Sequence, residues 1–127
     1  MAVQLNHTIV LARDREVSAR FYADVLGVKV AGRMGPFVVV ALDNDVTLDF
    51  VSVGDSAIPS QHYAFLVSEA EWDDIFARIR DRGLEYWADP FHRRSGETNT
   101  EFGGRGVYFE DPDGHNLEIM TTPYELQ

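Results

Sequence analysis

The second half of this chain repeats the order of predicted elements found in the first half. The first half begins with a strand-like segment, Val3–Leu11, followed by a helix that Asp14 can cap and Gly27 can end. Three short strand-like runs follow at Val28–Met34, Phe37–Leu42 and Val46–Val53. In the second half, strands are predicted at His62–Val67, Leu84–Phe91, Gly106–Glu110 and Leu117–Thr121, with a helix after the first of them. This repeat predicts two β-α-β-β-β modules, at about 1–54 and 60–122, within one domain of residues 1–127.

Both predicted helices have an apolar face. In the first, Val17, Phe21 and Val25 recur at helical spacing, so we expect all three side chains to face the core. The second begins with a capping box from Ser68 to Glu71, in which the hydroxyl and the carboxylate each satisfy a free backbone N–H. Its apolar positions are Trp72, Ile75, Phe76 and Ile79, and Gly83 can end it.

Overlaying the two modules pairs residues of the same chemical type. His62 lies 55 residues after His7, near the start of the first strand in each module. Asp49 and Glu118 each sit between two apolar residues in the last strand of a module, and they are 69 residues apart. The longer second spacing comes from a loop at 91–105 that is rich in Gly, Ser and Thr.

A pseudo-twofold axis relating the modules would bring His7, Asp49, His62 and Glu118 around one point. Such ligands suit a divalent ion such as Fe²⁺, Mn²⁺, Co²⁺, Ni²⁺ or Zn²⁺. Because successive strand residues face opposite sides, both carboxylates should point away from the helix-covered face. His7 shares its face with apolar Leu5 and Ile9, as expected of a buried strand. A single strand histidine is more often structural than a ligand, so the pattern leaves both roles open.

Composition excludes several classes of function. The chain has 127 residues, with 21 acidic and 11 basic side chains and a formal net charge of −10. A negative field of this size repels phosphate backbones. The absence of cysteine excludes disulfides, thiolate metal sites and cysteine nucleophiles. The N-terminal residues lack a signal-peptide pattern, and no apolar run approaches the ~18 residues that a membrane span needs. We therefore expect a cytoplasmic protein without nucleic-acid or membrane partners.

Three segments resemble the vicinal oxygen chelate superfamily, which includes glyoxalase I, bleomycin-resistance proteins, fosfomycin-resistance enzymes and extradiol dioxygenases. They are Leu5–Ile9, Phe21–Gly27 and Tyr108–Glu118, of which the last is the most diagnostic. The resemblance covers nearly the whole chain. It implies an α+β fold of two tandem βαβββ modules that form a cup-shaped incomplete barrel, and it implies a homodimer.

The resemblance also implies roles for individual residues. It carries His7, His62 and Glu118 onto the metal-ligand positions. It places Asp49 at a variable fourth position, which glyoxalase I fills with glutamate. Tyr108 resembles the tyrosine that extradiol dioxygenases use against a catecholate oxygen, and core packing is the alternative for this side chain.

Further polar residues lie close to these motifs. Asp111–Gly114 predicts a tight turn, with His115 facing solvent or hydrogen-bonded but not ligating a metal. His92, Arg93 and Arg94 lie at the start of the long loop. They could meet an anionic substrate or remain solvated.

The whole pattern predicts a metal-dependent enzyme acting on a small substrate with two adjacent oxygens. A glyoxalase I-like lyase would use Glu118 or Asp49 as its base. An extradiol dioxygenase-like enzyme would use the set of two histidines and one carboxylate. Asp49 stands where dioxygenases of this superfamily would have a further histidine, which counts against ring cleavage. The alternative is a metal-free protein that sequesters a drug or metabolite, and the acidic charge would suit a cationic ligand.

Overall fold

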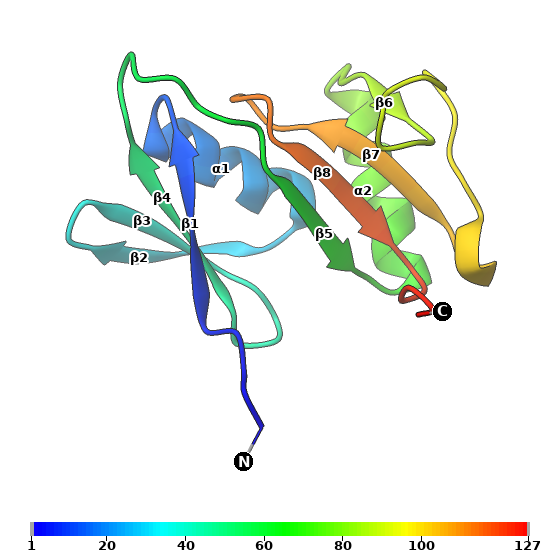
Figure 1. The fold of residues 1–127 in the computed structure, drawn as a ribbon, viewed down its shortest axis with the longest axis horizontal. Helices are drawn as coiled ribbons and strands as arrows, with labels where there is room; N and C mark the ends of the chain where they lie inside the picture. Colours follow the sequence, from blue (N-terminus) through cyan, green and yellow to red (C-terminus); the bar gives the residue numbers. More distant parts are fainter. Residues whose placement is uncertain (1, 127) are drawn as a thin grey trace. The chain divides into compact units, whose positions relative to one another are not determined.

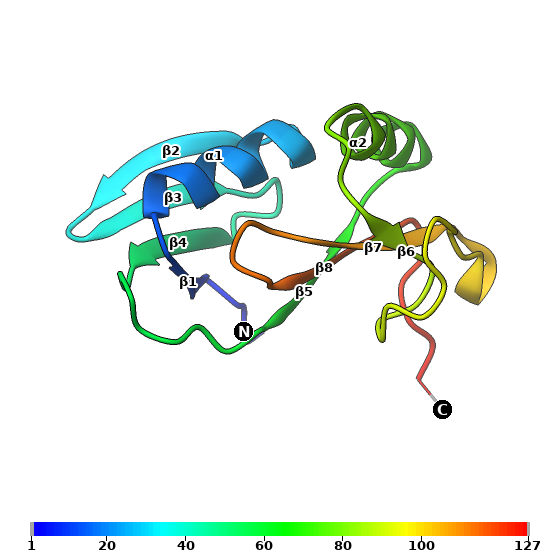
Figure 2. The same cartoon turned by 90° about the horizontal axis from the view of Figure 1, so that it is seen from above.

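The structure, a computed structural model, describes residues 2–126. It consists of two compact units that divide between Ile58 and Pro59. Each unit contains one four-stranded open sheet and one longer α-helix (Figures 1 and 2). The predicted α+β fold of two βαβββ modules is therefore confirmed, with open sheets. Within residues 2–126, neither helix has the length and apolarity that a bilayer crossing requires.

The first unit has the strand order β1-β4-β3-β2 (Figure 1). Strands β1 and β4 are parallel, whereas the β4–β3 and β3–β2 pairs are antiparallel. The elements of this unit are β1 (His7–Ala12), α1 (Arg15–Leu26), β2 (Lys29–Met34), β3 (Phe37–Ala41) and β4 (Thr47–Ser52).

Helix α1 covers one face of this first sheet and leaves the other face open (Figure 2). Its N-terminus is capped by the Asp14 carboxylate, which accepts from two backbone N–H groups, and Gly27 ends it in the left-handed conformation at φ 74°. Under the helix, the rings of Tyr22 and Phe50 pack edge-on at 4.8 Å, and both are fully buried. The expectation that Val17 faces the core is wrong, since this side chain is 56% exposed.

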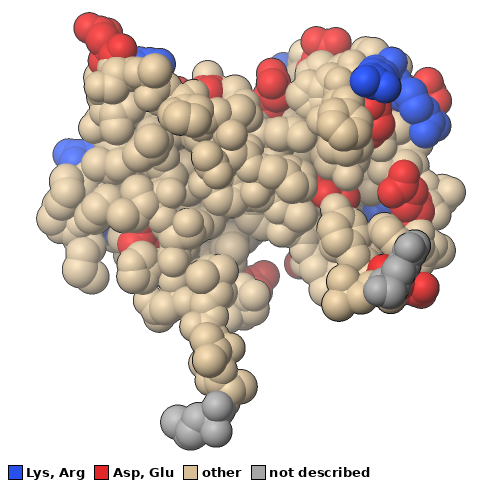
Figure 3. All heavy atoms as spheres, in the orientation of Figure 1, with Lys and Arg blue, Asp and Glu red and all other residues tan. Residues whose placement is uncertain are grey.

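The open face of the first sheet carries His7 and Ile9. The expectation that this face of the strand is buried is wrong, because His7 is exposed and Ile9 is 48% exposed. The buried side chains of β1 are Val10 and Ala12, on the helix side. Since only one helix covers the sheet within this unit, the apolar residues on its other face remain accessible, and Figure 3 shows few charged atoms there.

The second unit repeats this arrangement with the strand order β5-β8-β7-β6. Strands β5 and β8 are parallel, and the other neighbours are antiparallel. The elements are β5 (His62–Leu66), α2 (Glu69–Asp81), β6 (Tyr86–Trp87), the 3-10 helix η1 (Glu101–Gly103), β7 (Gly106–Glu110) and β8 (Asn116–Met120).

Helix α2 lies on one face of the second sheet (Figure 2). Its predicted capping box is confirmed, because Ser68 Oγ accepts from Glu71 N and the Glu71 carboxylate accepts from Ser68 N. Trp72, Ile75 and Ile79 are buried, as expected.

We expect Ser68→Ala to destabilise the second unit by about 0.5–2 kcal/mol, because the substitution leaves one helix N–H without its hydroxyl acceptor. Urea unfolding followed by circular dichroism measures the change. Ser56→Ala, at an exposed turn position of the chain, is the control. Equal midpoints for the two variants would mean that the capping box contributes no stability.

The prediction of a strand at Leu84–Phe91 is wrong in its length, because only Tyr86–Trp87 form a strand. Beyond this point the chain turns back, with Gly96 N–H donating to Tyr86 O and Ala88 N–H donating to Arg94 O. The turn is stabilised by the Asp89 carboxylate, which accepts hydrogen bonds from the backbone N–H groups of Arg93 and Arg94. These contacts, which a run of apolar residues does not reveal, end the strand early.

Candidate functional site

Glu118 lies on the central strand β8 of the second sheet, on the face opposite α2. It pairs with Tyr108 of β7 on one side and with Ala64 of β5 on the other. Its neighbours Leu117 and Ile119 are fully buried on the helix side. Although no helix of this unit covers this face of the sheet, Glu118 is only 4% exposed. A buried carboxylate is costly unless hydrogen bonds or a positive charge satisfy it, so the groups around Glu118 are informative.

His62 is the ring that lies against this carboxylate. Its Nε2 is 3.2 Å from Glu118 Oε1, and its Nδ1 is 2.9 Å from the backbone oxygen of Asn116. A carbonyl oxygen only accepts, so Nδ1 carries a hydrogen, and a neutral ring then directs the lone pair of Nε2 at the carboxylate. Two lone pairs at this distance repel each other unless a proton or a cation lies between them.

Two tyrosines complete the surroundings of Glu118. Tyr124 donates its O–H to Oε1 at 3.0 Å, and the Tyr108 ring stacks on His62 at 5.9 Å between ring centroids. Burial raises the pKa of Tyr108 far above its ordinary value, and the nearby Glu118 charge adds to this. The same two causes raise the pKa of Tyr124. Both phenols therefore remain protonated and can act as hydrogen-bond donors.

In the first unit, His7 and Asp49 occupy neighbouring strands on the open face of the sheet. The register pairs His7 with Thr47 and Ile9 with Asp49, so the two residues are offset by two positions. His7 Nδ1 is 2.8 Å from Asn6 Oδ1, and its Nε2 has no partner among residues 2–126. Asp49 Oδ1 accepts from Thr47 Oγ1 at 2.8 Å. Both histidines thus have Nδ1 engaged, and Nε2 of His62 faces the Glu118 carboxylate.

The His62 and Glu118 pair fits a divalent cation. Two donors that each lie about 2.1 Å from one ion, at angles between octahedral and tetrahedral, are roughly 3.0–3.4 Å apart. The observed separation of 3.2 Å falls within this range. The hydrogen bond from Nδ1 to a backbone carbonyl is also the usual outer contact of a metal-binding histidine.

The structure brings only part of the predicted set together. His62, Glu118 and Tyr108 meet in the second unit, whereas His7 and Asp49 lie in the first. Among residues 2–126, no three histidine or acidic side chains gather closely enough to hold an ion by themselves. The four-residue metal site across both modules therefore stays a prediction.

Sequence reasoning missed two residues of the second unit. The first is Asn116, whose backbone oxygen accepts from His62 Nδ1. Its side chain binds the long loop, where Oδ1 accepts from His92 Nε2 and Nδ2 donates to Pro90 O. Tyr124 is the other, because it follows the last predicted strand in a segment without any local pattern.

The loop residues have structural contacts of their own. His92 stacks flat on Trp87, with ring centroids 3.7 Å apart and planes 3° apart. Arg94 pairs with Glu97, and the Arg93 guanidinium lies over the exposed ring of Phe91.

The turn predicted at Asp111–Gly114 is confirmed. Gly114 N–H donates to Asp111 O, and the Asp111 carboxylate accepts from Asp113 N–H and His115 N–H. Of the two roles expected for His115, the structure shows the hydrogen-bonded one: its Nδ1 accepts from Gln61 N–H at 3.0 Å, and the residue is fully buried. Its contacts are those of a structural residue.

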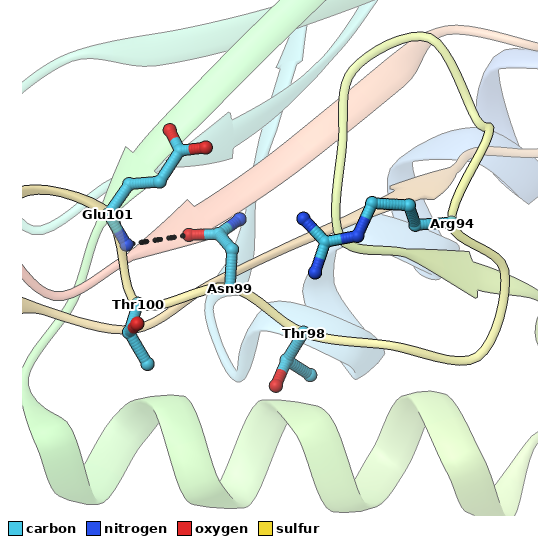
Figure 4. A pocket seen from close by; sticks show the side chains of 5 residues that line it. All are labelled: Arg94, Thr98, Asn99, Thr100 and Glu101. Atoms are coloured by element: carbon cyan, nitrogen blue, oxygen red, sulfur yellow. Dashed lines mark hydrogen bonds between the residues drawn. The ribbon is translucent and has the colours of Figure 1, made fainter.

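A pocket of about 250 Å³ lies in the long loop (Figure 4). Its lining residues are Arg94, Thr98, Asn99, Thr100 and Glu101. The Asn99 side chain serves the loop, because Nδ2 donates to Ala88 O and Oδ1 accepts from Glu101 N–H. None of the predicted site residues lines this pocket.

The paired modules and the histidine–carboxylate contact define a known class of protein. Residues 4–119 match the family model of the Glyoxalase/Bleomycin resistance protein/Dioxygenase superfamily, and the chain belongs to this superfamily. Its members include enzymes that act on small molecules.

Individual relatives are similar over most of the chain. The solved structure named Oxidase ChaP-H1 is 62% identical, covers 98% of this chain and 100% of its own, and superposes with a TM-score of 0.94. Glutathione transferase FosA of Serratia marcescens is 29% identical over 94% of this chain and 81% of its own length. A putative ring-cleaving dioxygenase, MhqE of Bacillus subtilis (strain 168), is 24% identical over 91% of this chain and 40% of its own length.

Proposed function

We propose that this protein is a divalent-metal-dependent oxidase that acts on a small substrate with two adjacent oxygens, with O₂ as the oxidant. The observation that carries the proposal is the buried Glu118 carboxylate, whose Oε1 faces Nε2 of His62 at 3.2 Å. Oxidation is favoured over the other activities of the superfamily because the 62% identical relative is named an oxidase.

In this proposal His7, His62 and Glu118 hold the cation, and Asp49 is a fourth ligand or a nearby base. When bound, the cation supplies Lewis-acid polarisation of the substrate oxygens. Tyr108 stays protonated beside His62 and donates its O–H to a substrate oxygen. The sheet shields Glu118 from bulk water, which strengthens its interaction with a bound charge.

The first test is metal uptake. We expect the protein, loaded separately with Fe²⁺, Mn²⁺, Ni²⁺ and Zn²⁺, to bind close to one ion per site for at least one metal, as quantified by mass spectrometry. His62→Gln should lose this uptake, because its amide cannot replace the imidazole lone pair. Glu110→Gln, on the same face of the sheet but exposed, is the matched control.

Activity assays then separate the alternatives. An oxygen electrode with a panel of catechols and related diols should record O₂ consumption that His62→Gln abolishes. Isomerisation of a glutathione hemithioacetal without O₂ consumption would instead support a glyoxalase-like lyase, with Asp49 or Glu118 as the base. A wild-type protein that takes up none of the four metals would favour sequestration of a drug or metabolite.

The proposal includes a homodimer in the cytoplasm, in keeping with the family resemblance. Light scattering coupled to size exclusion tests the oligomeric state, and a monomer at micromolar concentration would contradict it.

A further inference from the structure

Tyr124 is anchored at Glu118 from a segment outside the repeated modules. It follows β8 by four residues, in a segment without regular secondary structure. Its ring packs against Phe102 of η1 with centroids 5.3 Å apart, and its O–H donates to Glu118 Oε1 at 3.0 Å. The segment after the last strand thus places a hydroxyl on the candidate ligand.

The same oxygen of Glu118 meets both Tyr124 and His62. Oε1 is 3.0 Å from the phenol oxygen and 3.2 Å from His62 Nε2. A carboxylate oxygen has two lone pairs, so one can accept from the phenol while the other is directed at the imidazole. A hydrogen bond in this position opposes rotation of the carboxyl group away from His62.

From this geometry we infer that Tyr124 is a positioning residue for the metal site, which holds the Glu118 carboxylate in the orientation that presents Oε1 to an ion beside His62. The inference rests on the proposed function, since it assigns a role toward the proposed cation. In this role Tyr124 acts through Glu118 and is not itself a ligand.

Tyr108 also hydrogen-bonds to Glu118 and to Tyr124, but its place is fixed by the strand that carries it and not by the segment after β8. It projects from β7 directly opposite Glu118, is 5% exposed and is held in place by the sheet and by stacking on His62. Tyr124 is 52% exposed, and removing its hydroxyl leaves the ring contact with Phe102 intact. Tyr124→Phe therefore removes the hydroxyl that contacts Glu118 and Tyr108 without opening a core cavity.

The test is titration of the metal-stripped, full-length protein with Co²⁺, followed by its visible absorption bands. We expect Tyr124→Phe to bind Co²⁺ about 10–100-fold more weakly than the wild type, as is usual when an outer contact of a metal ligand is lost. We also expect altered d–d bands, which a purely structural role would not produce. Tyr86→Phe, which removes a hydroxyl of the same unit on the strand β6, is the matched control and should bind like the wild type.

Each outcome decides the inference. Equal affinity and equal spectra for Tyr124→Phe and the wild type would overturn the positioning role while leaving the proposed function standing. Tighter binding by Tyr124→Phe would also overturn it, because the phenol would then compete with the ion. No Co²⁺ binding by the wild type would overturn both. In a Glu118→Gln background, Tyr124→Phe should cause no further loss of affinity.

Discussion

Glu118→Gln is expected to reduce metal affinity by at least about 100-fold, more than the loss of an outer contact would cause. Glutamine keeps the volume of the side chain but removes the negative charge and leaves one acceptor oxygen, where His62 and Tyr124 both meet Oε1 of the carboxylate. Calorimetric titration of the metal-stripped protein measures the affinity. Glu110→Gln, also on the open face but exposed, removes the same charge from the protein and should leave the affinity nearly unchanged.

Thermal unfolding tests the effect of Glu118→Gln on metal binding by a second, independent measurement. An ion that binds only the folded protein at a free concentration of 100 times its Kd stabilises it by about 2.7 kcal/mol. We therefore expect added metal to raise the Tm of the wild type and not that of Glu118→Gln. A similar metal-dependent rise in both proteins would place the ion elsewhere and contradict the proposed site.

Phe50→Ala is expected to destabilise the protein by about 3–5 kcal/mol, the usual effect of removing a buried aromatic ring. Phe50 is fully buried between the first sheet and α1, where it packs against Tyr22. Val17→Ala on the same helix is the control, and because Val17 is 56% exposed its effect should stay within about 0.5 kcal/mol. Urea unfolding followed by circular dichroism measures both changes.

The same experiment tests the prediction that residues 1–127 form one domain. Both tryptophans, Trp72 and Trp87, lie in the second unit, so their fluorescence reports on that unit alone. If the two modules unfold as one cooperative domain, Phe50→Ala should lower the midpoint seen by fluorescence as much as that seen by circular dichroism. A fluorescence midpoint that does not move would mean that the units unfold separately.

The sequence alone determined the features that depend on contacts between near neighbours. The caps at Asp14 and Ser68 and the turn at Asp111–Gly114 each close hydrogen bonds within four residues, so local residue types are enough to predict them. Alternation along a strand likewise predicted that Asp49 and Glu118 face away from the helices. The repeat of these local patterns was sufficient for the α+β fold of two modules.

The tertiary structure decided what depends on residues far apart in the chain. The open face of β1, the early end of β6 and the burial of His115 follow from where a helix or a distant backbone group lies, which periodicity along one segment does not encode. At the candidate site, the overlay of the modules identified His62 and Glu118 and the family resemblance identified Tyr108, but the 3.2 Å contact and the tautomer of His62 came from the fold. Tyr124 reaches Glu118 from the irregular segment after β8, and its place in the sequence has no pattern that would predict this contact.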